Sequence, residues 1–421
     1  SRFLQFYDKV THLMKLNMTT VNPAFHLRNL QSNAFLIWMS LGAEALNPKM
    51  QRDVWRVLRS KGNVGSEYAI PIKHPDGTVD AMHWSDVYTL ANQYGVIDEG
   101  FFAKELGARA STKGIIKGVK PKYDPTDSKN FFLYEKGTNV GNFVENYGRL
   151  LHFAGALKQG YSPRDAAARV TKFMFDYSDL TMFEQTVLKR IIPFYTWMRK
   201  NSALQFEQLF EQPGKYALIA KSLHEIEDTN YGDEELGKVN KSFLPRYAQD
   251  MVQTPFKVSL PYGRFEPVMW NTALPIYDLN KLDITNPVEF GKMLMGSVSP
   301  VIKAPAEELT NYNTFFEKPI VKEGDSEVAK RAQHILSQLA LPNMYRSLAD
   351  KEGSDLAYSA FNNITGIKMT PINYEGYKKQ ILKKNGYVKS KPQKQVKPLK
   401  QKDMQKNIEK VLAKLAKQNQ Q

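Results

Sequence analysis

Residues 162–216 constrain the fold more than any other stretch of this chain, because they encode two consecutive helices with apolar faces. The first helix begins at Ser162, which offers a capping hydroxyl, and continues with Pro163 at the first helical position and Asp165 facing the helix dipole. Its apolar residues recur at helical spacing and form a stripe broad enough to need a packing partner. The stretch therefore predicts a packed helix pair.

The second helix of this stretch has a marked start, a marked end and an internal proline. Thr181 followed three residues later by Glu184 has the spacing of a capping box, and Pro213 with Gly214 ends the helical pattern. Pro193 lies inside the pattern, where it supplies no amide for the helical hydrogen bond. We therefore expect the helix to kink or to restart at Pro193.

The run 191–198 around this proline is nearly all apolar or aromatic and is followed at once by two cationic residues. Its length is too short to cross a bilayer, since a spanning helix takes about 20 residues. Two interpretations fit this run: a helix pair buried at a domain centre, and a hairpin that acts on membranes. The candidate contacts with a partner or a membrane are Ile191, Ile192, Phe194, Trp197 and Arg199.

The composition limits the class of protein. A chain of 421 residues with 42% hydrophobic residues can form two or three domains with a real core. It contains no cysteine, so disulfides and thiolate metal sites are excluded. We find no secretory signal and no apolar run of about 18 residues. The chain begins with serine, and its opening looks like the interior of a polypeptide, so we expect a fragment processed from a longer chain.

The net charge of +15 is concentrated at the C-terminal end. Residues 378–421 hold fourteen lysines and two acidic residues, hence twelve of the fifteen net positive charges. This run is either a solvated tail or a segment that attaches to a polyanion, such as packaged nucleic acid or an anionic bilayer. Lysine without arginine favours delocalised attraction over reading of bases. The candidate polyanion-binding residues are Lys378, Lys379, Lys383, Lys384, Lys389, Lys391, Lys394, Lys397, Lys400 and Lys402.

Hydrophobic spacing, turns and charge divide the chain into five regions. These are an N-terminal helical region (1–109) with a hairpin insert at 67–83, a linker (110–138), a central helical region (139–230), an irregular and helical region (231–350) and a lysine-rich tail (351–421). Within 228–288 we expect irregular structure with one small hairpin. We predict a mainly α protein: a multi-helix assembly with a small β-hairpin insert, an irregular proline-rich segment and an extended basic C-terminal tail.

Residue patterns for catalysis or metal binding are missing from the sequence. None of the seven histidines belongs to a pair spaced for a metal, and His224 lacks the second histidine of a zinc-protease helix. No serine lies in a Gly-x-Ser-x-Gly elbow, and Gly118 is not followed by the Gly-Lys-Ser/Thr of a phosphate-binding loop. We therefore predict no catalytic residue, no metal site and no cofactor, and expect that the protein is not an enzyme.

Three sequence patches together resemble a known family. They are Asn22-Pro23-x-Phe25-x-x-Arg28-Asn29-x-x-Ser32-Asn33, the stretch from Asp176-Tyr177 through Arg190-x-x-Pro193-Phe194-Tyr195-Thr196-Trp197-x-Arg199-x-Asn201 to Gln212-Pro213-Gly214-Lys215, and Ser299-Pro300-x-x-Lys303-x-Pro305-x-x-Glu308-Leu309-Thr310-Asn311. In this order they resemble a large polyvalent-protein-associated domain of very long phage and mobile-element polypeptides. The resemblance covers roughly residues 1–350 and leaves out the lysine tail.

The resemblance implies a bacteriophage internal virion or ejection protein that travels in the particle and enters the host with the DNA. Its partners would be other virion proteins of the portal, capsid or tail, further copies of itself, packaged DNA and, on ejection, the host membrane. Its location would be the capsid interior or the tail and portal region, then the host envelope or cytoplasm. Two alternatives remain: a nucleic-acid-acting module of a virion-associated polymerase-type polyprotein, and a static minor capsid or portal-associated protein.

Overall fold

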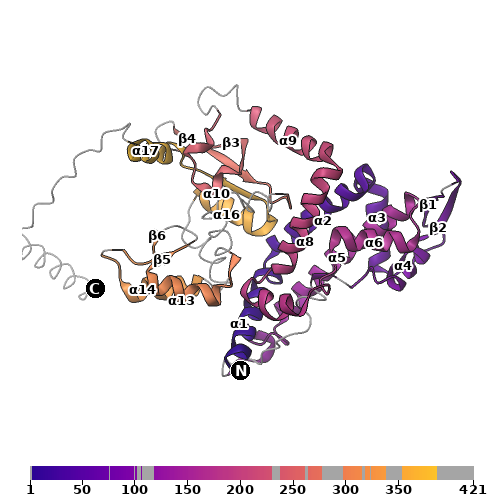
Figure 1. Ribbon diagram of the computed structural model, residues 1–421, viewed down its shortest axis with the longest axis horizontal. Helices are drawn as coiled ribbons and strands as arrows, with labels where there is room; N and C mark the ends of the chain where they lie inside the picture. The colour runs from indigo at the N-terminus through magenta and orange to yellow at the C-terminus, as the bar shows by residue number, and fades with distance from the viewer. Residues whose placement is uncertain are drawn as a thin grey trace, which may run out of the picture. The chain divides into compact units, whose positions relative to one another are not determined.

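The computed structural model describes residues 2–74, 76–98, 100–101, 106, 118–229, 238–260, 264–276, 297–314, 318–322, 324–337 and 353–385. These residues are mainly helical, as predicted, with short antiparallel sheets (Figure 1). Contacts group the chain into two units. The first holds Ser1–Val239 and Arg246–Ile372, and the second holds Asn240–Pro245 and the chain from Asn373 onward.

The N-terminal region of the first unit is helical. It consists of α1 (Arg2–Thr19), α2 (Pro23–Leu41), the 3-10 helix η1 (Gly42–Leu46) and α3 (Pro48–Arg59). Asn22 caps α2 by accepting the amide of Ala24, and Asn47 caps α3 by accepting the amides of Lys49 and Met50. A proline occupies the first turn of α2 and of α3, where its missing amide costs nothing. The Asn22-Pro23 pair therefore marks the start of α2.

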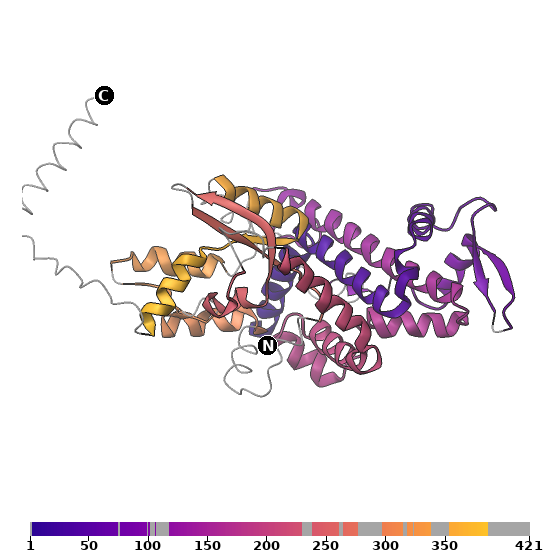
Figure 2. The same cartoon turned by 90° about the horizontal axis from the view of Figure 1, so that it is seen from above.

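The predicted hairpin insert is present as β1 (Ala69–Lys73) and β2 (Val79–His83), which pair antiparallel and lead into α4 (Trp84–Gln93). The long helix α5 (Phe132–Lys158) lies beside α2 (Figures 1 and 2), and α6 (Pro163–Met174) packs against both. Side chains of α2, α3, α4, α5 and α6 fill one hydrophobic core, in which Trp84, Leu150 and Phe153 are fully buried.

The helix α5 begins at Phe132, within the predicted linker 110–138, whose residues are described from 118 onward. A 3-10 turn, η3 (Pro121–Tyr123), and two aspartate-capped turns precede α5. Gly137, which lies within the predicted linker, is placed where a Cβ atom would come within 2.0 Å of the carbonyl oxygen of Thr20. The glycine therefore permits close packing of α5 on the end of α1.

Carbonyl groups at the C-terminal end of α2 are bound by side chains from three other helical segments. Lys215 Nζ donates to the carbonyls of Trp38 and Met39 at 3.2 and 2.6 Å. Arg169 donates to the carbonyl of Ser40 at 2.8 Å, and Gln159 to that of Leu41 at 3.0 Å. The last carbonyls of a helix lack partners within its regular hydrogen-bond pattern, so these side chains supply donors there, in addition to the amide of Gly42, which donates to the carbonyl of Trp38.

His152 lies fully buried beside this helix end. Its Nε2 is hydrogen-bonded to Oγ of Ser40 at 2.7 Å, and Arg169 Nε donates to the same hydroxyl at 2.7 Å. Burial, with the nearby charges of Arg169 and Arg149, lowers the pKa of His152 to about 3. The imidazole is therefore neutral at physiological pH.

The second predicted helix of the central stretch forms as separate pieces. They are a π-helical turn, η4 (Glu184–Leu188), then α7 (Lys189–Ile191) and α8 (Tyr195–Glu211). Ile192 has an extended backbone, and α8 restarts directly after Pro193 and Phe194, as the position of the proline predicted. α9 (Pro213–Asp228) follows α8 with Pro213 in its first turn, where we had placed the end of the helical pattern.

The later part of the first unit contains the predicted small hairpin, β3 (Val252–Leu260) paired with β4 (Arg264–Asn271). A third strand, β7 (Lys368–Pro371), pairs with β4 and was not predicted. The other elements are the short helix α10 (Arg246–Gln249), then α13 (Pro300–Thr310), β5 (Tyr312–Asn313), β6 (Lys318–Pro319), α14 (Glu327–Ser337) and α16 (Gly353–Thr365).

The predicted tail, 351–421, is not extended throughout. Its first part forms α16, β7 and α17 (Tyr374–Lys384), and residues beyond 385 lie outside the described structure. In the second unit, Asn373 caps α17 by accepting the amide of Gly376, and the Tyr374 hydroxyl accepts the amide of Asn240 at 3.2 Å. Asn240 directly precedes the 3-10 helix η5 (Lys241–Phe243), so this hydrogen bond holds η5 against α17.

His152→Gln should remove part of the acid sensitivity of the fold. Between about pH 3 and 6.5 the unfolded chain binds a proton at His152 that the folded chain does not, so stability falls as the pH is lowered. Glutamine binds no proton, and the slope of unfolding free energy against pH between about 4.5 and 6 should fall by about 1.4 kcal/mol per pH unit. Urea unfolding at several pH values measures this slope, and an unchanged slope would contradict a buried neutral histidine.

Candidate functional site

Glu184 joins the two sides of the helix break at Pro193. Its Oε2 accepts the amide and the hydroxyl of Thr181 at 2.8 and 2.9 Å, which confirms the predicted capping box. Its Oε1 accepts the hydroxyl of Tyr195 at 2.8 Å and lies 2.7 Å from Nε of Arg199. The backbone hydrogen bond from Thr181, the hydroxyl of Tyr195 and the charge of Arg199 lower the pKa of Glu184. The carboxylate therefore links the helical segments before and after the break at Pro193.

Residues from other parts of the chain also hold the apolar run 191–198 in place. Arg190 forms a two-pronged ion pair with Asp8 of α1, with both N–O distances at 2.9 Å, and its carbonyl accepts the Tyr7 hydroxyl. The amide of Ser299 donates to the carbonyl of Ile191 at 2.6 Å. These contacts attach the run to α1 and to the start of α13.

The three patches that carry the family resemblance meet at this place. Ser299 of the third patch is bonded to the second patch through Ile191. Phe25 of the first patch stacks near Phe101 with ring centroids 6.0 Å apart, and Phe101 lies 6.2 Å from Phe194 of the second. Lys215, at the end of the second patch, binds the α2 carbonyls. The polar residues of the patches named here hold helices together.

The five predicted contact residues do not share one environment. Ile191 and Arg199 are exposed, whereas Ile192, Phe194 and Trp197 are half-buried. Phe194 and Trp197 pack against the second hydrophobic core of the unit, and the Trp197 ring lies 5.3 Å from that of Phe175 with edge-to-face geometry. The part of the run that we assigned to a partner or a membrane is therefore largely occupied by contacts within the protein.

Exposed apolar side chains gather instead on α8, and sequence reasoning did not predict them as contacts. Phe206 is 59% exposed, Phe210 is 70% exposed, and their rings pack edge to face at 5.0 Å. Leu209 lies between them and is also exposed. We refer to Phe206, Leu209 and Phe210 as the α8 face.

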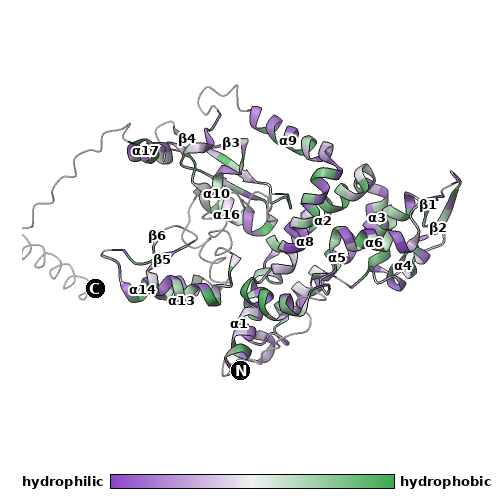
Figure 3. Cartoon of the chain, in the orientation of Figure 1, coloured by the Kyte–Doolittle hydropathy of each residue, from purple (hydrophilic) through white to green (hydrophobic). Residues whose placement is uncertain are grey.

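The side of α8 that packs inward is largely polar. Asn201 donates to the carbonyl of Pro275 at 3.0 Å, Gln205 donates to Asn201 at 3.2 Å, and Tyr216 donates to Gln205 at 2.9 Å. Hydrophobic and hydrophilic residues alternate along α8 and α9 (Figure 3). The helix thus buries amides and exposes phenylalanines, the reverse of an ordinary surface helix. An exposed apolar group of this kind is typical of a binding surface.

The pattern of α8 contained a signal for this arrangement. Phe206 and Phe210 are four residues apart and are each followed by a glutamate, Glu207 and Glu211. Lys172 of α6 lies 2.9 Å from Glu207 and 3.9 Å from Glu211, so the acids border the α8 face and face α6. The amides Asn201, Gln205 and Gln208 lie on the other side of the helix and are buried.

The third patch forms a buried charged cluster between α13 and α14. His334 lies between two carboxylates, with Nε2 3.0 Å from Glu307 and Nδ1 2.6 Å from Glu308. Burial raises the pKa of Glu307, but hydrogen bonds from Thr314 and the nearby charges outweigh it and lower the pKa overall. Arg331 pairs with Glu308 at 2.8 Å. These groups satisfy one another and tie the two helices together.

The described part of the predicted lysine site lies on α17. Lys378, Lys379 and Lys383 belong to this helix, Lys384 ends it, and Lys378 lies 3.8 Å from Glu375. The remaining candidates lie outside the described residues: Lys389, Lys391, Lys394, Lys397, Lys400 and Lys402. The helix therefore carries a cluster of cations at the beginning of the lysine-rich sequence.

Within the described residues, no three histidine or acidic side chains are placed to hold a metal ion. In the same part of the chain, no helix has both the length and the apolar character of a membrane span. No family model, curated protein or solved structure matches the chain. The family resemblance and the function that it implies therefore stay predictions.

Trp197→Ala should lower the unfolding free energy by about 2–4 kcal/mol, because it removes a ring that packs on Phe175 in the second core. Phe206→Ala and Phe210→Ala should each cost about 1 kcal/mol or less, because these rings are already largely in water. Denaturant unfolding of the three variants measures the difference. Equal losses would contradict the assignment of Trp197 to the core and of the α8 face to the surface.

Proposed function

We propose that this chain is a non-enzymatic bacteriophage virion protein, carried inside the particle and delivered with the DNA during genome ejection. In this role the α8 face binds a neighbouring virion protein or another copy of the chain. The lysine-rich C-terminal sequence attaches to packaged DNA by unspecific electrostatic attraction. After release, exposed apolar helices can engage the host membrane.

The observation that carries this proposal is the reversed polarity of α8. In an isolated chain, α8 buries amides and leaves Phe206 and Phe210 in water. The exposed apolar area then contributes nothing to the free energy of folding, because only buried apolar area gives a hydrophobic contribution. A partner that covers the α8 face regains that contribution. A protein that assembles with neighbours needs such a surface, whereas an enzyme needs a pocket with positioned catalytic groups.

The charged residues near the centre support the same role. Glu184, Arg190 and Lys215 are used in contacts between helices, and the carboxylate of Glu307 lies 3.0 Å from the His334 ring. The pKa values of Glu184 and Glu307 are lowered and that of Arg190 is raised, and hydrogen bonds to neighbouring groups contribute to each shift. The lysines of the C-terminal sequence supply positive charge for a polyanion and take no part in the contacts named above.

The experiment that tests the proposal labels the chain inside purified phage particles and follows it through DNA release. The chain should disappear from the emptied particles and be recovered with the released DNA or in the host envelope. If the labelled chain stays entirely in the emptied particle, delivery is excluded and the chain is a static component.

A matched pair of variants tests the α8 face in the same particles. Phe206→Ser with Phe210→Ser should reduce incorporation into particles several-fold, because the apolar contact is lost. Phe256→Ser removes a phenylalanine of similar exposure, 55%, from β3 and should leave incorporation unchanged. Equal incorporation of both variants would contradict a role of the α8 face in assembly.

A further inference from the structure

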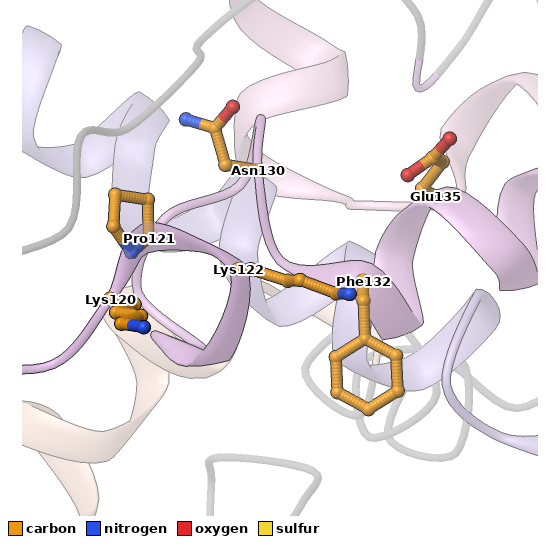
Figure 4. Close-up of a pocket in the computed structure, with 6 residues that line it drawn as sticks. All are labelled: Lys120, Pro121, Lys122, Asn130, Phe132 and Glu135. Carbon is orange, nitrogen blue, oxygen red and sulfur yellow. The ribbon is translucent and has the colours of Figure 1, made fainter.

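A pocket of about 540 Å³ opens on the loop that leads into α5 (Figure 4). Its volume lies within the roughly 300–1,000 Å³ of known small-molecule sites. It is open to solvent, and its lining combines cations, an amide, an aromatic ring and one carboxylate. The lining residues are Lys120, Pro121, Lys122, Asn130, Phe132 and Glu135. We refer to it as the Lys120–Lys122 pocket.

The loop that forms this pocket is fixed by two buried aspartates. Asp124 accepts the amide and the hydroxyl of Thr126 at 2.8 and 2.6 Å. Asp127 accepts the amides of Lys129 and Asn130 at 3.2 and 3.0 Å. Side chains that close turns in this way hold the backbone in one conformation. The pocket is therefore built before any ligand arrives.

Tyr134 attaches this loop to the helical frame. Its hydroxyl lies 2.6 Å from Oδ1 of Asn17 in α1 and 2.9 Å from the carbonyl of Pro125. Its ring packs edge to face on Phe131, with centroids 4.9 Å apart, and both rings are buried. A ligand in the pocket would thus contact a rigid part of the protein.

The cations of the pocket are available to a ligand. Among the described residues, no ion pair or hydrogen bond involves the ammonium of Lys120 or Lys122, and both side chains are exposed. Lys122 Nζ lies 5.9 Å from the ring centre of Tyr123. The carboxylate that lines the pocket belongs to Glu135, so the lining has a net positive charge. Two ammonium groups at a pocket rim are suited to phosphate oxygens.

Aromatic rings stand next to these cations. Tyr123 is 57% exposed, and its ring centre lies 6.1 Å from that of Phe132 at an interplanar angle of 72°. Figure 4 shows Phe132 and Lys122 among the residues that line the pocket. Exposed rings beside lysines are the arrangement that binds unpaired bases, since the ring stacks on the base and the lysines hold the backbone.

We propose that the Lys120–Lys122 pocket binds single-stranded nucleic acid. One base stacks on Tyr123 or Phe132, and its flanking phosphates lie against Lys120 and Lys122. Glu135 accepts a hydrogen bond from a base N–H group. Duplex DNA does not fit this site, because its bases are already stacked on each other. The site is separate from the lysine-rich C-terminal sequence and does not rest on the virion role, so either idea can fail alone.

Photo-crosslinking of the full chain locates the site directly. A short oligothymidylate carrying 5-iododeoxyuridine is irradiated with the protein at about 0.3 M salt, which weakens purely electrostatic binding by the lysine-rich sequence. Peptide mapping should place the main crosslink in residues 118–136, at Tyr123 or Phe132. Crosslinks confined to residues 378–421, or spread evenly over the chain, would overturn the proposal.

A matched pair of double variants tests the same site by affinity. Lys122→Ala with Tyr123→Ala should weaken binding of the oligothymidylate by roughly tenfold at this salt concentration, because a stacking ring and a cation are lost. Lys49→Ala with Tyr94→Ala removes the same residue types from other exposed positions and should change the affinity less than about twofold. If both double variants weaken binding by the same factor, the proposal that the Lys120–Lys122 pocket is the binding site is wrong.

Two further probes separate base stacking from attraction to phosphate. An abasic oligomer of the same length has no base to stack and should bind the unchanged chain weakly. Its affinity should be about that of oligothymidylate for the double variant Lys122→Ala with Tyr123→Ala. A duplex of the same length should compete poorly at about 0.3 M salt. If the abasic oligomer or the duplex binds as tightly as the oligothymidylate, stacking is absent and the proposal fails.

Discussion

The hydrogen-bond requirement of the C-terminal end of α2 organises the helical frame. The carbonyls of residues 38–41 lie where other helices pack. The amide of Gly42 donates to the carbonyl of Trp38, and side chains from other helical segments donate to all four carbonyls. Gln159, Arg169 and Lys215 come from three different helical segments to supply the donors. The negative end of the helix dipole favours the two cations. Once these donors are in place, the positions of α5, α6 and α9 relative to α2 are fixed, and both hydrophobic cores form between them.

Local signals in the sequence were sufficient for many elements. The cap at Asn22, the capping box of Thr181 with Glu184, the hairpin at 67–83 and the break at Pro193 all depend on residues a few positions apart. Long-range pairing was not predictable in this way. The strand β7 pairs Pro371 with Val268, about a hundred residues away, and nothing in its four residues indicates that partner. Gly137 lies within the predicted linker 110–138, yet it is a residue that lets α5 approach the end of α1.

The candidate site likewise depends on contacts between residues that are distant in the sequence. The spacing of apolar residues predicted helices both in the run 191–198 and in α8. Spacing alone does not determine which of these apolar residues are buried against the rest of the protein and which are exposed. Phe194 and Trp197 are half-buried because Phe101 and Phe175 offer rings to pack against. Phe206 and Phe210 are exposed because Asn201 and Gln205 find hydrogen-bond partners on the inner side. The decision between these faces depends on residues that are distant in the sequence, such as Pro275. The Lys120–Lys122 pocket was missed because its residues read as a linker.

The central claim is that side chains of other helical segments, Lys215 among them, hold the C-terminal end of α2 by donating to its carbonyls. The most direct measurement is the unfolding free energy of Lys215→Met compared with Lys221→Met, which removes an exposed lysine of the same helix. Lys215→Met leaves the carbonyls of Trp38 and Met39 without this donor and should cost about 1–3 kcal/mol. Lys221→Met should change the free energy by about 0.5 kcal/mol or less. Equal, small changes in both variants would contradict the account.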